Sequence, residues 1–222
     1  MVYKSEKNPY HRSGYWGRSS EYPILNWVKN VVWFTRMFSP GAWIYARYQV
    51  VGPTGKSSTN PVAVDRYIIL SNVLVFLFYV AIPAQWYGII TLAVATILLL
   101  EPLNYHVDRM IIRKSFDPEY RPSNPSRSIL ISIFEYFKMI FLFAAIYLSI
   151  VPGEFIESLV PALITLNKVK ALEFSAVTLC TVGFGSLAPQ PGSTAGIIAG
   201  IEGLIGVLYM GALVATAIGR QE

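Results

Sequence analysis

The sequence predicts an all-α membrane protein with four transmembrane helices, a short re-entrant helix and loop between the last two, and an N-terminal amphipathic helix. Composition is the first reason: 54% of the 222 residues are hydrophobic, only 14% are charged, and the mean hydropathy is +0.46. The second is that the apolar residues form long blocks, which is typical of membrane spans. The third is a loop with two glycines, residues 181–185, between the last two blocks.

The apolar blocks predict spans over residues 66–81, 86–103, 129–151 and 193–218. Polar stretches around them divide the chain into four expected segments. These are an N-terminal arm with the amphipathic helix (1–65), a two-helix hairpin (66–107), a linker (108–127) and a C-terminal module (128–222).

Most of the 18 Lys and Arg residues lie before the first span, in the central linker or at the C-terminus. Cytoplasmic segments carry an excess of such residues, so we expect both termini and the linker to be cytoplasmic. The distribution of the basic residues indicates that the net charge of +5 reflects orientation in a lipid bilayer rather than binding to nucleic acid. The polar N-terminus predicts no cleaved leader, and the location expected is the plasma membrane, as a multi-pass protein.

An amphipathic helix is predicted over residues 24–38, where Trp27, Val31, Phe34 and Phe38 recur at helical spacing. Two interpretations stay open. The helix lies on the cytoplasmic leaflet, or it packs on an unidentified membrane or cytoplasmic partner. The sequence assigns no further role to residues 1–107.

The residues offer little for catalysis or for a resident metal. The chain has one cysteine, Cys180, and two histidines, His11 and His106, with no metal-ligand spacing. Residues 52–57 read Gly-Pro-Thr-Gly-Lys-Ser, but the spacing between the glycines and the lysine differs from that of a phosphate-binding loop. We therefore expect neither an enzyme nor a cofactor.

Residues 171–180 form an apolar stretch too short to cross a bilayer, which predicts a re-entrant helix. Glu173 is expected in its first turn, where a carboxylate complements the positive end of the helix dipole. The loop that follows reads Thr181-Val182-Gly183-Phe184-Gly185. Its glycines allow backbone conformations that turn carbonyl oxygens toward a single axis, and irregular backbone at membrane depth must line protein or water.

Residues 128–219 resemble the pore module of tetrameric potassium channels, whose order is outer helix, pore helix, Thr-Val-Gly-Tyr/Phe-Gly filter and inner helix. The resemblance implies that the carbonyls of Thr181, Val182, Gly183 and Phe184, with the Thr181 hydroxyl, bind K+. Gly185 completes this selectivity filter. The ion would be the permeant species rather than a cofactor, and four chains would complete the ring.

The filter's surroundings depart from the family pattern. Ser186 stands where the family most often has Asp, and Val177 stands where some members have Glu. Cys180 replaces a common Thr, and Glu173 with Phe174 replaces an aromatic pair. We expect these changes to affect the stability of the open state more than K+ selectivity.

Two residues of the predicted inner helix have two interpretations each. Gly206 lies near the family's gating hinge, or serves close packing alone. Glu202 is an acid inside a span, which either attracts cations toward the pore or binds a neighbouring helix. Small residues at four-residue spacing further predict close helix packing: Gly192, Gly196 and Gly200 form one series, and Ala199 and Gly203 form another.

The sequence thus predicts a homotetrameric potassium-selective channel. Spans one and two carry no regularly spaced arginines, so no voltage sensor of the usual kind is expected. Two alternatives stay open. One is a non-conducting structural or regulatory subunit of a larger membrane complex, and the other is a non-selective cation channel.

Overall fold

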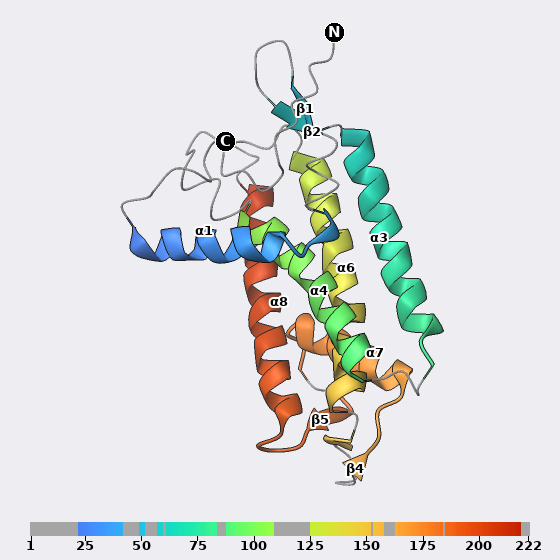
Figure 1. Cartoon of the computed structure of the whole chain (residues 1–222). Helices are drawn as coiled ribbons and strands as arrows, with labels where there is room; N and C mark the ends of the chain where they lie inside the picture. Colours follow the sequence, from blue (N-terminus) through green and yellow to red (C-terminus); the bar gives the residue numbers. More distant parts are fainter. Residues whose placement is uncertain are drawn as a thin grey trace. The chain divides into compact units, whose positions relative to one another are not determined.

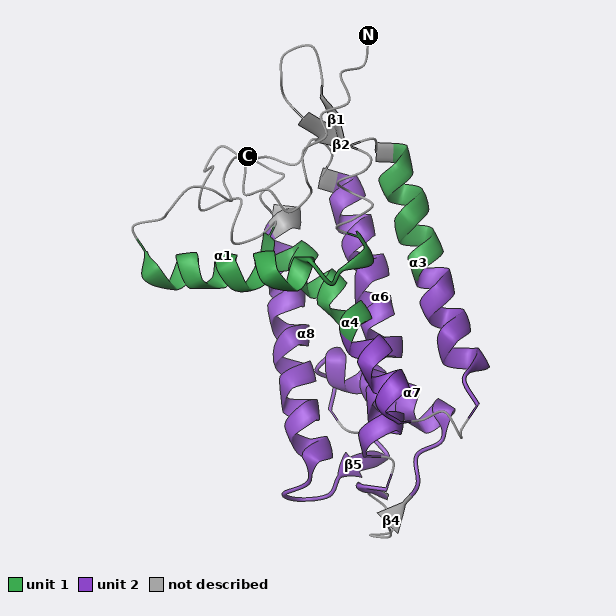
Figure 2. Cartoon of the chain, viewed as in Figure 1, with its two compact units in different colours: residues 1–71, 97–124 green, residues 72–96, 125–222 purple. Residues whose placement is uncertain are grey.

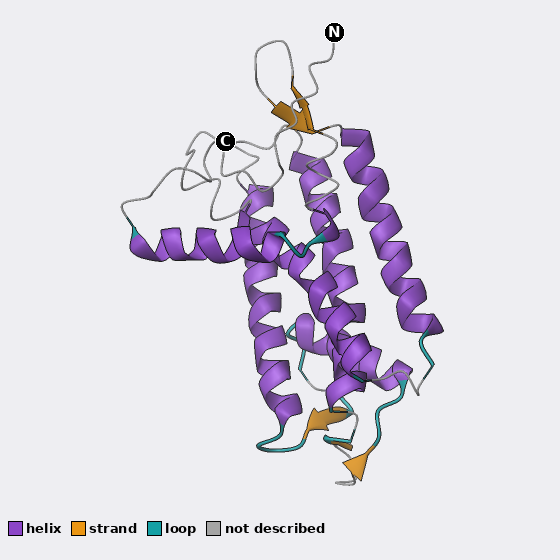
Figure 3. Cartoon of the chain, viewed as in Figure 1, coloured by secondary structure: helices purple, strands orange, loops and turns teal. Residues whose placement is uncertain are grey.

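The computed structural model describes residues 22–41, 49–51, 57–59, 61–83, 88–108, 125–151, 153–157, 163–183 and 185–218. This described part consists of helices and of five strands of two or three residues, joined by turns and loops (Figures 1 and 3). The six helices are α1 (Pro23–Arg36), α3 (Pro61–Ala81), α4 (Ile89–Val107), α6 (Pro125–Ile150), α7 (Lys168–Leu179) and α8 (Thr194–Ile218). The strands are β1 (Gln49–Val51), β2 (Ser57–Thr59), β3 (Phe155–Glu157), β4 (Leu163–Ile164) and β5 (Leu187–Pro189).

Four helices are long and apolar enough to cross a membrane, which confirms the four predicted spans. The apolar segments run over Val62–Ala81, Ile89–Val107, Ser126–Ile150 and Thr194–Ala215. The first begins earlier than predicted because Pro61 suits the first position of a helix and the following charged residues continue it. The second continues past Pro102 to Val107, so this proline does not end the helix.

The chain divides into two compact units, shown in Figure 2. Unit 1 comprises residues 1–71 and 97–124, and unit 2 comprises residues 72–96 and 125–222. The hairpin helices α3 and α4 each contribute to both units. The four segments expected from composition are continuous stretches of sequence, whereas these units are groups of segments in contact. The four-segment division stays a prediction.

In unit 2, α6 packs against both α7 and α8, and α7 packs against α8 (Figure 1). The apolar face of α6 supplies much of this core, with Met139, Leu142, Ala144 and Tyr147 fully buried. Of the four apolar helices, α6 is the most buried. The short helix α7 is therefore held by two long neighbours.

A three-stranded antiparallel sheet in the order β4-β3-β5 lies next to this core. In it β3 pairs with β5, with Phe155 opposite Pro189. The Phe155 ring also packs edge-on against Phe174 of α7, with centroids 4.9 Å apart. No strands were predicted here from the sequence, because strands this short carry no readable alternation. The sheet fixes the backbone that leaves the 181–185 loop.

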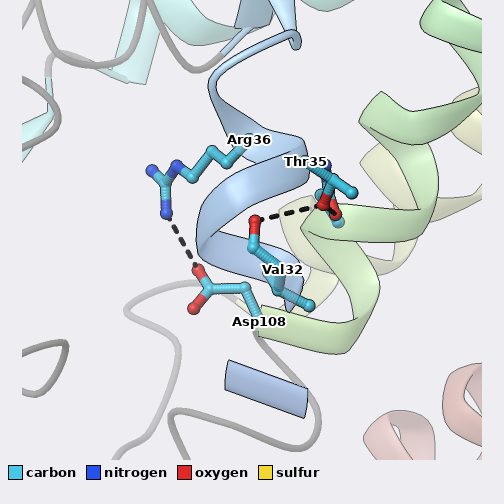
Figure 4. Close-up of polar contacts among 5 residues, drawn as sticks. Val32, Thr35, Arg36 and Asp108 are labelled. Atoms are coloured by element: carbon cyan, nitrogen blue, oxygen red, sulfur yellow. Dashed lines mark hydrogen bonds and ion pairs between the residues drawn. The ribbon is translucent and has the colours of Figure 1, made fainter. Parts of the chain in front are cut away.

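In unit 1, one face of α1 packs near the end of α4 (Figure 4). The Thr35 hydroxyl donates to Asn104 Oδ1 at 2.8 Å. Arg36 forms an ion pair with Asp108 at 3.7 Å, and Val32 on the same face is buried. The hydrogen bond and the ion pair thus join α1 to the last turn of α4 and to the residue after it.

Candidate functional site

Helix α7 begins earlier than the sequence predicted. The Asn167 side chain accepts a hydrogen bond from the backbone N–H of Lys170 at 2.9 Å, which makes Asn167 the N-cap. Because of this cap the helix starts at Lys168 rather than at residue 171, and Glu173 falls beyond its first turn. The predicted dipole role of Glu173 is therefore wrong, since the first turn carries no acidic residue.

The C-terminal end of α7 runs directly into the predicted filter. The Thr181 N–H bonds to the Thr178 carbonyl and the Val182 N–H to the Val177 carbonyl, both at 3.0 Å. With Thr181 at φ 58°, these two bonds make a Schellman motif, the helix ending in which the left-handed residue is usually glycine. A β-branched residue at positive φ is strained, and such strain clusters at functional sites. The first filter residue is therefore set by the helix end itself.

Positive φ angles recur along the loop at every second residue. They are 58° at Thr181, 110° at Gly183 and 52° at Gly185, while Val182 between the first two has none. Alternation of left- and right-handed residues places successive N–H groups along one edge of the chain, so the carbonyls lie along the other. Phe184 lies outside the described residues, so its position in this pattern stays a prediction.

The loop is exposed on the single chain, whereas the helix end before it is buried. Thr178 and Leu179 are buried, and Cys180, Thr181, Gly183 and Gly185 are exposed. The apolar side chain of Val182 is 79% exposed. The described residues of the 181–185 loop are thus accessible on the single chain, where other molecules can contact them.

One polar contact joins the residue after the loop to α7. The Ser186 hydroxyl donates to Glu173 Oε1 at 3.3 Å. Ser186 and Glu173 are two of the residues at which the sequence departs from the potassium channel pattern. In this chain the hydroxyl follows the loop and the carboxylate lies on the helix.

A seam of mostly small residues on α8 faces α6 and α7. Spaced three or four apart, its members are Ala195, Ala199, Glu202, Gly206 and Tyr209, all of them buried. Gly206 packs on the Leu179 carbonyl, which is the close-packing interpretation of this glycine. The predicted hinge role of Gly206 stays a prediction. Gly200, by contrast, has nothing within 4 Å of a built Cβ, so it takes no part in close packing within the described chain.

Glu202 is fully buried among three helices, at 0% exposure. The Tyr147 hydroxyl of α6 donates to Glu202 Oε2 at 2.6 Å, and Ser175 of α7 bonds to Oε1 at 2.6 Å. These two hydrogen bonds agree with the interpretation that Glu202 binds neighbouring helices. Sequence reasoning missed both partners, because neither is close to Glu202 in the chain.

The described chain thus has four helices long and apolar enough to cross a membrane, which is typical of an integral membrane protein. A short capped helix and a strained loop lie between the last two. Residues 135–220 match the family model described as an ion channel. The match runs from α6 to the end of α8 and covers less than half of the chain. It confirms the predicted resemblance: this segment is similar to an ion channel domain. Comparison with the curated proteins and with the solved structures found no match.

Proposed function

We propose that the chain forms a homotetrameric potassium-selective channel whose filter is built from residues 181–185. The observation that carries the proposal is the alternation of φ at Thr181, Gly183 and Gly185. Such an alternation would turn the loop carbonyls to one edge of the chain, directly after a helix end. Rings of backbone carbonyls can replace the hydration shell of K+. Conduction then needs no covalent step and no cofactor.

A single chain supplies only one carbonyl edge, so a ring requires further copies. The exposure of the loop supports this, because an apolar side chain such as Val182 gains from burial against a neighbour. Helix α8 also exposes apolar residues away from its seam: Ile197, Ile201, Leu204, Val207 and Leu208. Neighbouring copies and lipid would cover these side chains.

The helix dipole adds to the attraction of a cation. The C-terminal end of α7 lies next to Thr181, and aligned peptide dipoles place roughly half a negative charge at such an end. The 12 residues of α7 span about 18 Å at 1.5 Å per residue, well short of a bilayer. We therefore propose that α7 is a re-entrant pore helix that ends inside the membrane. The basic residues favour cytoplasmic termini in a plasma membrane.

We further propose that α1 lies at the membrane interface. Its side opposite α4 carries an exposed apolar stripe at helical spacing, made of Ile24, Trp27, Val31 and Phe34, and the exposed Phe38 follows just past the helix end. A fluorophore on Ile24→Cys in a Cys180→Ser background should be quenched by brominated lipid, and one on the buried Val32→Cys should not. Protection of both positions from lipid would favour a protein partner instead.

Liposomes containing the purified protein test the channel directly. We expect K+ flux that exceeds Na+ flux, and loss of K+ flux in Gly183→Ala, because a side chain is strained at φ 110°. Gly211→Ala is the matched control, since a Cβ there meets nothing within 4 Å. Equal K+ and Na+ flux would instead indicate a non-selective cation channel. Absence of flux from wild-type protein would favour a non-conducting subunit.

A further inference from the structure

Glu202 connects all three helices of the ion channel domain. Its Oε2 accepts from Tyr147 of α6 and its Oε1 contacts Ser175 of α7, both at 2.6 Å. Ser175 also bonds to the carbonyl of Ile140 on α6 at 2.9 Å. Ser175 and Glu202 are both 0% exposed, so these contacts lie in the interior of unit 2.

The hydrogen atoms in this cluster can be counted. The Ser175 hydroxyl has one proton and two acceptors within reach, Glu202 Oε1 and the Ile140 carbonyl. When Glu202 is a carboxylate, its Oε1 accepts the hydrogen bond that the Ser175 hydroxyl donates. If the group at position 202 instead donates a hydrogen bond to the Ser175 oxygen, the Ser175 hydroxyl is free to donate its own hydrogen to the Ile140 carbonyl. Both arrangements leave α6, α7 and α8 connected, so the cluster needs a forked polar group rather than a particular charge.

An acid inside a membrane span is costly to bury, and apolar packing alone does not require it. Two glycines of α8 also lie against α7: Gly206 lies on the Leu179 carbonyl, and Gly203 lies near that of Thr178. Glu202 is therefore the α8 residue whose side chain binds α7 by hydrogen bonding in the described contacts. Ser175 lies on the helix that ends at the 181–185 loop.

We propose that Glu202 is a positioning residue: it holds α7 against α8 and thereby sets the position of the loop carbonyls. The inference rests on the proposed potassium channel function and adds a determinant of its selectivity that lies outside the loop. A shift of α7 relative to α8 moves Thr181 with it, because Thr181 forms the Schellman ending of that helix.

Two substitutions separate positioning from filling of space. Glu202→Gln keeps the fork, since its carbonyl oxygen accepts from Tyr147 and its amide donates to Ser175, which then donates to Ile140. Glu202→Leu keeps much of the volume and removes both bonds. The matched control is Tyr209→Phe on the same seam, which removes the bond to the Ser132 carbonyl of α6 and keeps the ring that packs on Tyr136.

The experiment compares K+ and Na+ permeation in liposomes for wild type and these three variants, after each has been checked for assembly. We expect Glu202→Leu to lower the K+/Na+ permeability ratio about tenfold, the factor that corresponds to losing the one buried hydrogen bond that joins Glu202 to α7. Glu202→Gln and Tyr209→Phe should keep the wild-type ratio within about twofold, since neither breaks the link to α7. If Glu202→Leu does not assemble, Ser175→Ala decides, because it removes the link between α7 and Glu202, together with the contact to the Ile140 carbonyl, and leaves Glu202 bonded to Tyr147.

An assembled Glu202→Leu or Ser175→Ala protein with the wild-type ratio would overturn the inference. So would a Glu202→Gln protein as impaired as Glu202→Leu. Wild-type protein is measured first, so that failure of the proposed function is visible separately. If wild type does not favour K+, the channel proposal itself fails, whatever the variants do.

Discussion

Gly206 of α8 lies so close to Leu179 of α7 that a Cβ on the glycine would be 2.0 Å from the Leu179 carbonyl oxygen. The same oxygen accepts a hydrogen bond from the Tyr136 hydroxyl of α6 at 2.7 Å. The last residue of the proposed pore helix is thus held from both sides, by a hydroxyl and by a bare backbone. Any side chain at position 206 must displace one of the two helices.

The first prediction concerns this contact. Gly206→Ala should lower stability by roughly 1–3 kcal/mol, because the atom it meets is backbone and cannot rotate away. Thermal unfolding in detergent measures the effect. Gly211→Ala is the control, and it should be neutral or stabilising by up to about 1 kcal/mol, since alanine favours the helix and the site is open. Equal melting temperatures for the two variants would show that α7 and α8 do not touch here.

The second prediction concerns Ser186. Potassium channels, which the segment resembles, most often have Asp at this position. In this chain, however, Ser186→Asp should reduce the time for which K+ flux is sustained. The new carboxylate would face that of Glu173, whose Oε1 now accepts from the serine hydroxyl at 3.3 Å. Adding Glu173→Gln should restore the flux by removing the repulsion. Improved flux in Ser186→Asp alone would show that Glu173 does not face position 186.

The third prediction concerns the strain at Thr181. Thr181→Gly should raise the stability of the protein by up to about 1 kcal/mol, because glycine adopts φ 58° without penalty. It should also reduce preference for K+, since the hydroxyl proposed to bind the ion is lost. Thr181→Ser keeps the hydroxyl and should keep the preference. A melting temperature that falls in Thr181→Gly would contradict the strained helix ending.

The fourth prediction concerns the contact between α3 and α7 in unit 2. The Lys168 ammonium donates to the Val80 carbonyl at the end of α3 at 2.7 Å, and the Tyr79 hydroxyl donates to the Lys168 carbonyl. Lys168→Met should loosen the last turn of α3, because the Val80 carbonyl loses its charged hydrogen-bond donor. Hydrogen exchange should be faster there by up to about tenfold, for a loss near 1 kcal/mol. Lys170→Met is the control, and equal exchange in both variants would count against the contact.

The sequence predicts the spans well because long apolar blocks are a strong signal. It predicts the ends of elements less well. Asn167 is a cap residue type directly before a helix, so the true start of α7 was readable from that signal. The three-residue strands around Phe155 and Leu187 were not, because they depend on pairing between distant segments.

The candidate site shows the same division. The glycines at 183 and 185 predict unusual backbone from residue type alone, and both have positive φ. The positive φ of Thr181 is not readable, because it follows from the way α7 ends. The partners of Glu202 are unreadable for another reason. Tyr147 is 55 residues away in sequence, and only the packing of α6 on α8 brings it near.

Determination of the structure of the purified particle in K+ tests the central claim most directly. The account predicts four copies of the chain around one axis, with residues 181–185 nearest to that axis and ion density between their carbonyls. A particle with a single copy of the chain, or with residues 181–185 away from any symmetry axis, would contradict it.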